Sequence, residues 1–194
     1  MKIGIFGGCF NPPHKMHYEI VKKLIETGYI DKCIIVPTGN DYNKRDLENI
    51  NDRINMIKIM IDMNNIEISD ISKDINYQYT YQVLDYFKNI YPKDDVYFIC
   101  GTDNLDEFET WQKNEYILEK YKLLVIRRND DNIDEIMQKY DNYKNNIVIS
   151  KIAQNLISST MIRERIKQED YIGIEKYINK EVANYIKKKR LYKN

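Results

Sequence analysis

The chain has 194 residues, in which 30 Lys and Arg balance 30 Asp and Glu, so the formal net charge is zero. A surface field that attracts polyanions is therefore excluded, and any phosphate must be bound by locally placed groups. Hydrophobic residues make up 43% of the chain, no apolar run approaches the roughly 18 residues of a membrane span, and the N-terminus lacks a signal-peptide pattern. The composition predicts a globular protein with no membrane partner.

Short β-branched runs alternate with segments of helical period along residues 1–157. The runs are Ile3–Phe6, Cys33–Val36, Ile66–Ile68, Val96–Cys100, Leu123–Ile126 and Ile147–Ile149. Between them, three sets of apolar residues have helical spacing: Ile20, Val21, Leu24 and Ile25; Ile54, Ile57, Met60 and Ile61; Val83, Leu84 and Phe87. Strands separated by helices predict an α/β fold, a doubly wound parallel sheet covered on both faces.

From Ser158 onward only a helical pattern remains. Its apolar positions are Ile162, Ile166, Ile174, Ile178, Val182 and Ile186. No Pro-, Gly- or Ser-rich linker precedes this segment, so we expect a single domain over residues 1–194, with an α/β core at 1–157 and a helical tail at 158–194. The run Lys187–Arg190 fits a nucleic-acid contact or a solvated helix end, and the helix dipole favours the solvated end. No nucleic-acid partner is expected.

The number and spacing of the cysteines indicate a reducing compartment. Cys9, Cys33 and Cys100 match neither a CxxC pair nor a zinc ribbon, which predicts free thiols in a reducing compartment, most simply the cytoplasm. Cys33 and Cys100 fall in strands and are expected to be packing residues. The oligomeric state is not encoded in these patterns, and a homo-oligomer stays open.

The loop after the first predicted strand, residues 7–17, is the first candidate site. In open α/β sheets, ligands bind at the carboxyl ends of strands, where a loop leads into a helix. Gly7 and Gly8 allow a ligand to approach the backbone closely. His14 and His17, the two histidines of the chain, would share one side of the first helical turn beside free N–H groups. Two imidazoles at a positive helix end predict an anion site.

Three other interpretations of this loop stay open. The histidines fit one capping and one packing role, or a zinc site, although no carboxylate or thiol stands at a matching position in the same turn. Cys9 beside a histidine also fits a thiol nucleophile. A phosphate-loop phosphatase would have Arg where Lys15 stands, so a small apolar role for Cys9 is favoured.

A second motif, Ile157–Arg163, opens the tail. Ser158, Ser159 and Thr160 are capping residues before a helical run, and Arg163 falls in its first turn. They would present hydroxyls, amide N–H groups and a guanidinium to phosphate oxygens. A capped helix with a surface Arg is the alternative.

Both motifs are similar to those of a known family. The pattern GxFGGxFxPxHxxH over residues 4–17 resembles the first motif of the HxGH nucleotidyltransferases, and ISSTxxR over residues 157–163 resembles their second. Val36–Gly39, Arg53 with Met56, Tyr79 with Thr80, Gly101–Leu105, Trp111 and Arg127 extend the resemblance, end to end, to the nicotinate-nucleotide adenylyltransferases. The resemblance implies a Rossmann-like fold and adenylyl transfer from ATP to nicotinate mononucleotide, giving deamido-NAD and pyrophosphate in NAD biosynthesis.

The resemblance also implies roles for individual residues. The catalytic residues would be His14, His17 and Arg163. The ATP-binding residues would be Gly7, Gly8, Phe10, His14, His17, Asp103, Ser158 and Arg163. The acceptor-binding residues would be Lys44, Tyr79, Thr80, Trp111 and Arg127. The cofactor would be Mg²⁺, bridging phosphate oxygens without a dedicated set of protein ligands. For Trp111 a core position is the alternative to stacking on the pyridine ring.

The sequence departs from the family pattern at several positions. Met16 stands where HxGH has Gly, Cys9 replaces Thr, Asn11 replaces Asp, and Tyr42-Asn43-Lys44 replaces Pro-His-Lys. These changes keep three alternatives open: nicotinamide mononucleotide as acceptor, phosphopantetheine as acceptor, and a nucleotide-binding module without catalysis. With zero net charge, we expect the positive groups to gather at His14, His17, Lys44, Arg127 and Arg163.

Overall fold

A parallel sheet of six strands, ordered β3-β2-β1-β4-β5-β6, forms the centre of the computed structural model. The structure describes residues 1–41, 46–73, 79–128, 131–154 and 157–193. The strands are β1 (Lys2–Gly8), β2 (Lys32–Pro37), β3 (Ile66–Ile68), β4 (Asp95–Gly101), β5 (Lys122–Arg128) and β6 (Ile147–Gln154). Each predicted apolar run lies inside one of these strands, so the parallel α/β sheet is confirmed. The strand order reverses between β1 and β4, which makes their carboxyl ends a switch point where ligands bind.

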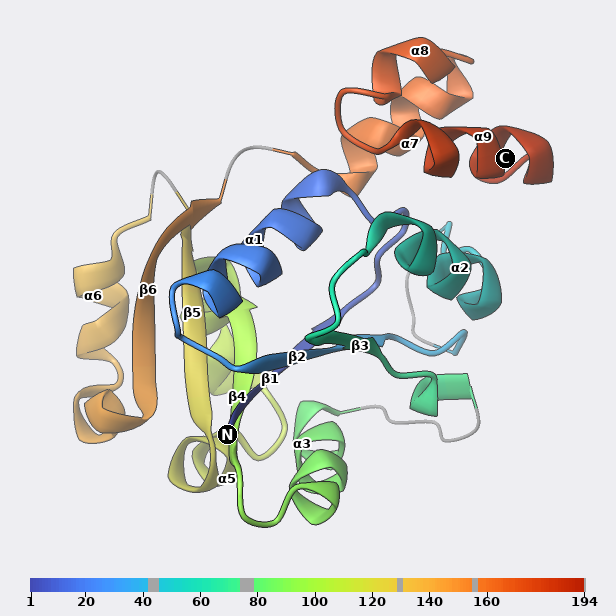
Figure 1. Cartoon of the computed structure of the whole chain (residues 1–194). Coiled ribbons are helices and arrows are strands. Elements are labelled where there is room, and N and C mark those ends of the chain that lie inside the picture. Colours follow the sequence, from blue (N-terminus) through green and yellow to red (C-terminus); the bar gives the residue numbers. More distant parts are fainter. Residues whose placement is uncertain (42–45, 74–78, 129–130, 155–156, 194) are drawn as a thin grey trace.

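Helices cover both faces of the sheet (Figure 1). One face packs against α1 (Lys15–Glu26) and α2 (Ile50–Met60), and the other packs against α3 (Thr80–Ile90), α5 (Asn114–Lys120) and α6 (Ile133–Gln138). The shorter elements are α4 (Thr102–Asp106) and the 3₁₀ helices η1 (Ile71–Lys73), η2 (Phe108–Thr110) and η3 (Asp141–Asn146). Because both faces are covered, the strands are continuous apolar runs.

Alternate residues along each strand serve the two faces. Ile34 and Val36 of β2 face the α3 side, whereas Cys33 and Ile35 face the α1 side. Cys33 and Cys100 are free and buried, and burial raises the pKa of both thiols, that of Cys100 to about 12. The expectation that these two cysteines are packing residues is confirmed.

The C-terminal segment forms α7 (Ser159–Lys167), α8 (Tyr171–Ile174) and α9 (Lys180–Lys189), which lie beside α2 and the N-terminal end of α1 (Figure 1). The apolar positions predicted for this segment are all 0% exposed. They form a separate apolar cluster, and Met56 of α2 belongs to it as well. The tail therefore packs against α2 through this cluster.

The basic end of α9 makes contacts within the chain. The Lys187 ammonium lies 5.5 Å from the centre of the Tyr171 ring, and Lys189 Nζ lies 3.6 Å from a carboxylate oxygen of Asp52. Within the part of the chain that the structure describes, no helix is long and apolar enough to cross a membrane.

Candidate functional site

The loop between β1 and α1 is held by buried polar contacts. Asn11 is 1% exposed, and its amide nitrogen donates to the Asp46 carbonyl at 2.7 Å while its amide oxygen accepts from the Glu48 N–H at 3.0 Å. Phe10, with a φ of 47°, turns its ring into the core at 3% exposure. The peptide bond from Asn11 to Pro12 is cis. The loop is thus a fixed element with defined side-chain directions.

His14 and His17 stack on each other at the N-terminus of α1. Their ring centroids are 3.6 Å apart, and Phe10 packs edge-on against His17 at 5.0 Å. The His14 backbone N–H donates to His17 Nδ1 at 3.1 Å. An accepting Nδ1 in a neutral imidazole leaves the proton on Nε2, so His17 is fixed as an Nε2–H donor. His14 Nδ1 is buried and has no hydrogen-bond partner among the described residues.

Neither imidazole is charged at neutral pH. Burial lowers the pKa of His14 to about 4, and burial together with the neighbouring His14 lowers the pKa of His17 well below its usual range. Burial thus opposes the positive charge that was expected on these two rings. They offer hydrogen bonds instead. The capping alternative is correct in one respect, since His17 caps the His14 N–H.

The Met16 side chain lies in the core, away from the loop's ligand-facing side. It is 4% exposed and belongs to the apolar cluster that includes Phe10 and Ile20. Its bulk is therefore accommodated inside the protein. Among the described residues, no group of three or more His, Cys, Asp or Glu side chains is placed to hold a metal ion.

The second motif lies directly against this loop. Ser158 is the N-cap of α7 and accepts from the Met161 N–H at 3.2 Å, which is the predicted cap. Ser159 Oγ donates to the Pro12 carbonyl at 2.8 Å. Arg163 donates from Nη1 to the Asn11 carbonyl at 2.8 Å and from Nη2 to Thr160 Oγ1 at 3.2 Å. The fold therefore joins two motifs that are about 150 residues apart in the sequence.

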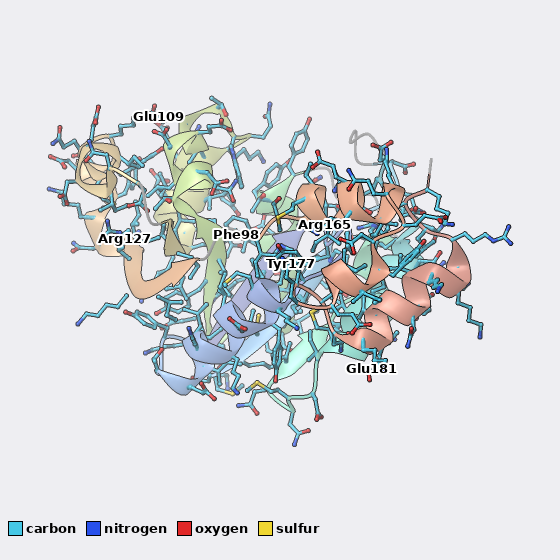
Figure 2. The ribbon with its side chains drawn as sticks, turned by 90° about the horizontal axis from the view of Figure 1, so that it is seen from above. Phe98, Glu109, Arg127, Arg165, Tyr177 and Glu181 are labelled. Carbon is cyan, nitrogen blue, oxygen red and sulfur yellow. The ribbon has the colours of Figure 1, made fainter. Side chains whose placement is uncertain are left out.

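The tail also fixes the start of α1. The Lys15 N–H donates to the Tyr177 carbonyl at 2.8 Å, and Lys15 Nζ donates to the Glu175 carbonyl at 2.7 Å. Tyr177 in turn lies under the Arg165 guanidinium at 5.8 Å, and Figure 2 shows these two side chains together at the C-terminal helices. Lys15 is thus a structural contact between α1 and the tail.

A cavity of about 250 Å³ opens at the carboxyl ends of β1, β2 and β4, and we call it the strand-end cavity. Five of the residues expected at the site line it: Gly7, Gly8, Tyr79, Thr80 and Trp111. Cys9, Thr38, Ser72, Phe98 and Asn104 line it as well. The two glycines of the predicted loop and three of the five predicted acceptor-binding residues thus meet around one space.

Trp111 and Tyr79 form the aromatic part of this cavity. The Trp111 ring is partly buried and packs at 5.0 Å from Phe108 and at 5.8 Å from Phe98. Tyr79 is 42% exposed and lies parallel to Tyr81 at 6.1 Å. Trp111 is held by the core and still borders the cavity, so it has features of both alternatives stated for it.

Several expected residues do not line the cavity, among them the motif side chains His14, His17, Ser158 and Arg163. The Arg127 guanidinium pairs with Asp131 at 3.0 Å and lies on the β6 and α6 side of the molecule (Figure 2). Asp103, in the first turn of α4, is exposed, while its neighbour Asn104 lines the cavity. Phe10 supports His17 from the core. Lys44 lies outside the described residues.

Arg53 is a structural residue of the site to which the sequence analysis gave no role. Its side chain is 0% exposed and donates to the carbonyl oxygens of Glu48 at 2.7 Å, Cys9 at 2.8 Å and Thr38 at 2.6 Å. Its position on the apolar face of α2, three residues after Ile50, is the signal that marks it: a charged residue there must find buried partners.

Comparisons with known proteins agree with this geometry. The model of the family described as cytidylyltransferase-like matches residues 5–165. The chain is 35% identical to a protein of Endomicrobium trichonymphae named "Probable nicotinate-nucleotide adenylyltransferase", over 99% of both chains. It is 38% identical to a protein of Fusobacterium nucleatum with the same name, over 97% of this chain and 98% of that relative. The solved structure titled "Plasmodium falciparum nicotinic acid mononucleotide adenylyltransferase complexed with NaAD" has a TM-score of 0.82 at 26% identity, covering 98% of this chain and 97% of that chain.

Proposed function

This chain belongs to the nicotinate-nucleotide adenylyltransferases of the cytidylyltransferase-like family, and we propose that it transfers the adenylyl group of ATP to nicotinate mononucleotide. The products are deamido-NAD and pyrophosphate. One observation carries the proposal: Arg163 of the second motif donates to the Asn11 carbonyl of the first motif, whose residues Gly7 and Gly8 line the strand-end cavity. A site made by these two motifs together is what a transfer between two phosphate-bearing substrates requires.

The acceptor brings its own nucleophile. A phosphate monoester carries nearly two negative charges at pH 7, so its oxygen needs no general base. The protein's contribution is to align that oxygen in line with the α-phosphorus of ATP and to offset charge on the leaving pyrophosphate. The P–O bond to the α-phosphorus forms as the bond to the β-phosphate oxygen breaks, and the electron pair leaves with pyrophosphate.

On the ATP side, two donors face the phosphates in this proposal. His17 offers its Nε2–H, and Arg163 offers a guanidinium fixed by Asn11 and Thr160. His14 Nδ1, buried without a partner in the described chain, gains one when a phosphate occupies the site. Ser158 keeps the start of α7 beside them. Uncharged imidazoles donate at a lower desolvation penalty than imidazolium ions in this buried place.

The proposal assigns no protein side chains as ligands of Mg²⁺. The described residues contain no group of three or more metal-ligating side chains, so they do not build a cage for the ion. Mg²⁺ bound to ATP phosphates would reduce the charge on the leaving group, and we expect it to enter with the nucleotide.

On the acceptor side, the strand-end cavity supports a pyridine mononucleotide. An indole borders it at Trp111, and a flat electron-poor ring suits an indole face. Tyr79 and Thr80 line the same cavity at the start of α3. Arg127 and Asp103 do not line the cavity, and this proposal gives them no contact with the acceptor.

The buried free thiols of Cys33 and Cys100 support placing this reaction in a reducing compartment, the cytoplasm.

The proposal is tested by measuring pyrophosphate release from ATP with each of three acceptors: nicotinate mononucleotide, nicotinamide mononucleotide and phosphopantetheine. We expect the highest kcat/KM with nicotinate mononucleotide. Efficient turnover with phosphopantetheine alone would contradict the acceptor. ATP binding without pyrophosphate release for any acceptor would identify a binding module instead.

A further inference from the structure

Asn11 of the β1–α1 loop is bound from two sides. Its carbonyl accepts from Arg163 Nη1 of α7 at 2.8 Å, and its side-chain oxygen accepts from the Glu48 N–H at 3.0 Å. Asn11 is 1% exposed, so both hydrogen bonds lie inside the protein. One side of the loop therefore depends on α7, and the other side depends on where Glu48 lies.

Glu48 makes hydrogen bonds to three different parts of the chain. Besides its N–H, which donates to Asn11, its carbonyl accepts from Arg53 Nε at 2.7 Å. Its carboxylate oxygen Oε1 accepts from the Tyr192 N–H at 2.6 Å. Tyr192 follows α9 and is 144 residues from Glu48 in the sequence. Through Glu48, the segment after α9 is thus connected to the β1–α1 loop.

Tyr192 is held in place by the packing of the tail. Its side chain is 4% exposed and belongs to the tail cluster with Met56 of α2 and Ile162 of α7. Its φ is 62°, in the left-handed region that bulky residues adopt only where surrounding contacts determine the backbone. The Leu191 N–H donates to the Ile186 carbonyl at 3.1 Å, which fixes the turn before it. Packed groups therefore set the direction of the Tyr192 N–H toward Glu48.

The charges that hold the loop also act on the Tyr192 hydroxyl. Burial, and then the charge of Glu48, raises the pKa of Tyr192 well above its usual range, whereas Arg53 and Arg163 act in the opposite direction. Both of these guanidinium groups bind carbonyl oxygens of the β1–α1 loop. Tyr192 thus lies near both cations that fix this loop.

We infer that Glu48 is a positioning residue for the transfer: its carboxylate ties the segment after α9 to the loop that carries the first motif. The inference rests on the proposed function, in which Arg163 and His17 donate to phosphates. Glu48 does not line the strand-end cavity, so it acts through Asn11. When Glu48 no longer binds Tyr192, Asn11 gains freedom, and the guanidinium bound to its carbonyl moves with it.

The test compares four variants with the wild type in the transfer reaction, at a temperature where circular dichroism shows each of them folded. Glu48→Ala removes the acceptor of the Tyr192 N–H, and Glu48→Gln keeps an oxygen in that place. Tyr192→Phe keeps both the N–H and the ring. Lys193→Ala is the matched control, because it removes only the exposed ion pair to Glu169.

We expect the kcat of Glu48→Ala to fall roughly 10-fold with both KM values nearly unchanged, because misplaced donors affect the transition state most. The other three variants should stay close to the wild type. Amide hydrogen exchange of residues 9–14 supplies a second readout that does not depend on activity. Exchange should be faster in Glu48→Ala and unchanged in Glu48→Gln and Lys193→Ala.

Unchanged kcat and unchanged exchange in Glu48→Ala would overturn the inference. Equal losses of kcat in Glu48→Ala and Glu48→Gln would assign the effect to charge rather than to the hydrogen bond, and a loss in Tyr192→Phe would assign it to the hydroxyl; either result overturns it. A wild-type protein that forms no dinucleotide would contradict the proposed function, and hydrogen exchange would still decide whether Glu48 holds the loop.

Discussion

The two histidine side chains differ in their hydrogen bonding. His17 is fixed by its contact to the His14 N–H and by the Phe10 ring, so it presents one defined donor. His14 is 3% exposed, and its Nδ1 has no hydrogen-bond partner among the described residues. The spacing of two histidines in one helical turn predicts their proximity. It does not predict their charge, because burial beneath the loop and against Phe10 depends on residues that meet only in the fold.

Two substitutions of His17 should distinguish its role as acceptor for the His14 N–H from its role as Nε2–H donor. His17→Asn keeps an acceptor for the His14 N–H and removes the Nε2–H donor, whereas His17→Ala removes both. We expect kcat to fall by about 10² to 10³ in each variant, as when a donor to transition-state charge is lost. Melting temperatures should show little loss of stability for His17→Asn. Unfolding of both variants with no separable loss of kcat would identify His17 as a core residue.

His14 should make stability depend on pH. Its pKa is about 4 in the folded chain and 6.5 when unperturbed, so below pH 6.5 the unfolded chain binds a proton that the folded chain excludes. The contribution of His14 to the free energy of unfolding is therefore fully present above pH 6.5, and it is lost as the pH falls toward 4. The loss amounts to about 2 kcal/mol between about pH 7 and about pH 4.5.

The measurement is urea unfolding of the wild type and of His14→Asn across this pH range. The variant should lose less stability on acidification than the wild type. A double variant, His14→Asn with His17→Asn, removes every imidazole from the chain and serves as the reference for carboxylate titration. Parallel pH profiles for the wild type and the double variant would show that the buried imidazoles do not contribute.

Among the elements, the tail acts on the site through its first helices. Its cap at Ser158 and its apolar positions follow a helical pattern that the sequence displays, and both were found as predicted. Its attachment was harder to foresee, because the Lys15 N–H and the Arg163 guanidinium bind backbone carbonyls, which carry no sequence signal. The tail is thus held against the β1–α1 loop and the start of α1.

The tail core offers a matched pair of substitutions. Ile178 is 0% exposed and follows Tyr177, whose carbonyl accepts the Lys15 N–H, while Ile172 is 86% exposed on the same tail. Ile178→Ala should lower the free energy of unfolding by about 2 to 5 kcal/mol and raise the KM for ATP more than that for the acceptor. Ile172→Ala should change stability by less than about 0.5 kcal/mol. Equal effects of the two substitutions in urea unfolding would contradict a packed tail.

At the scale of the whole molecule, the sequence predicts the strands better than the site. Each of the six predicted apolar runs lies in one of the six parallel strands, and helices cover both faces of the sheet. Arg127 and Arg53 illustrate the limit for the site. Arg127 fits a basic motif position, but Asp131, four residues later, binds its guanidinium. Arg53 donates to the Thr38 carbonyl, 15 residues away, and only the fold brings these two groups together.

Because the net charge of the chain is zero, the charged groups that matter for the site are those placed near it. Burial lowers the pKa of both imidazoles and so opposes positive charge on them. Two guanidinium groups have fixed partners: Arg163 binds the Asn11 carbonyl of the loop, and the buried Arg53 binds the carbonyls of Cys9 and Thr38. In the proposed reaction, locally fixed donors rather than a strong long-range field would bind phosphate.

The central claim is transfer of the adenylyl group, and ATP labelled at its α-phosphorus tests it most directly. Wild-type protein is incubated with this ATP, Mg²⁺ and nicotinate mononucleotide, and the products are separated and identified by mass. The account predicts that the label appears in deamido-NAD, with one pyrophosphate released for each dinucleotide formed. Label recovered only in unreacted ATP or in AMP, with no labelled dinucleotide, would contradict it.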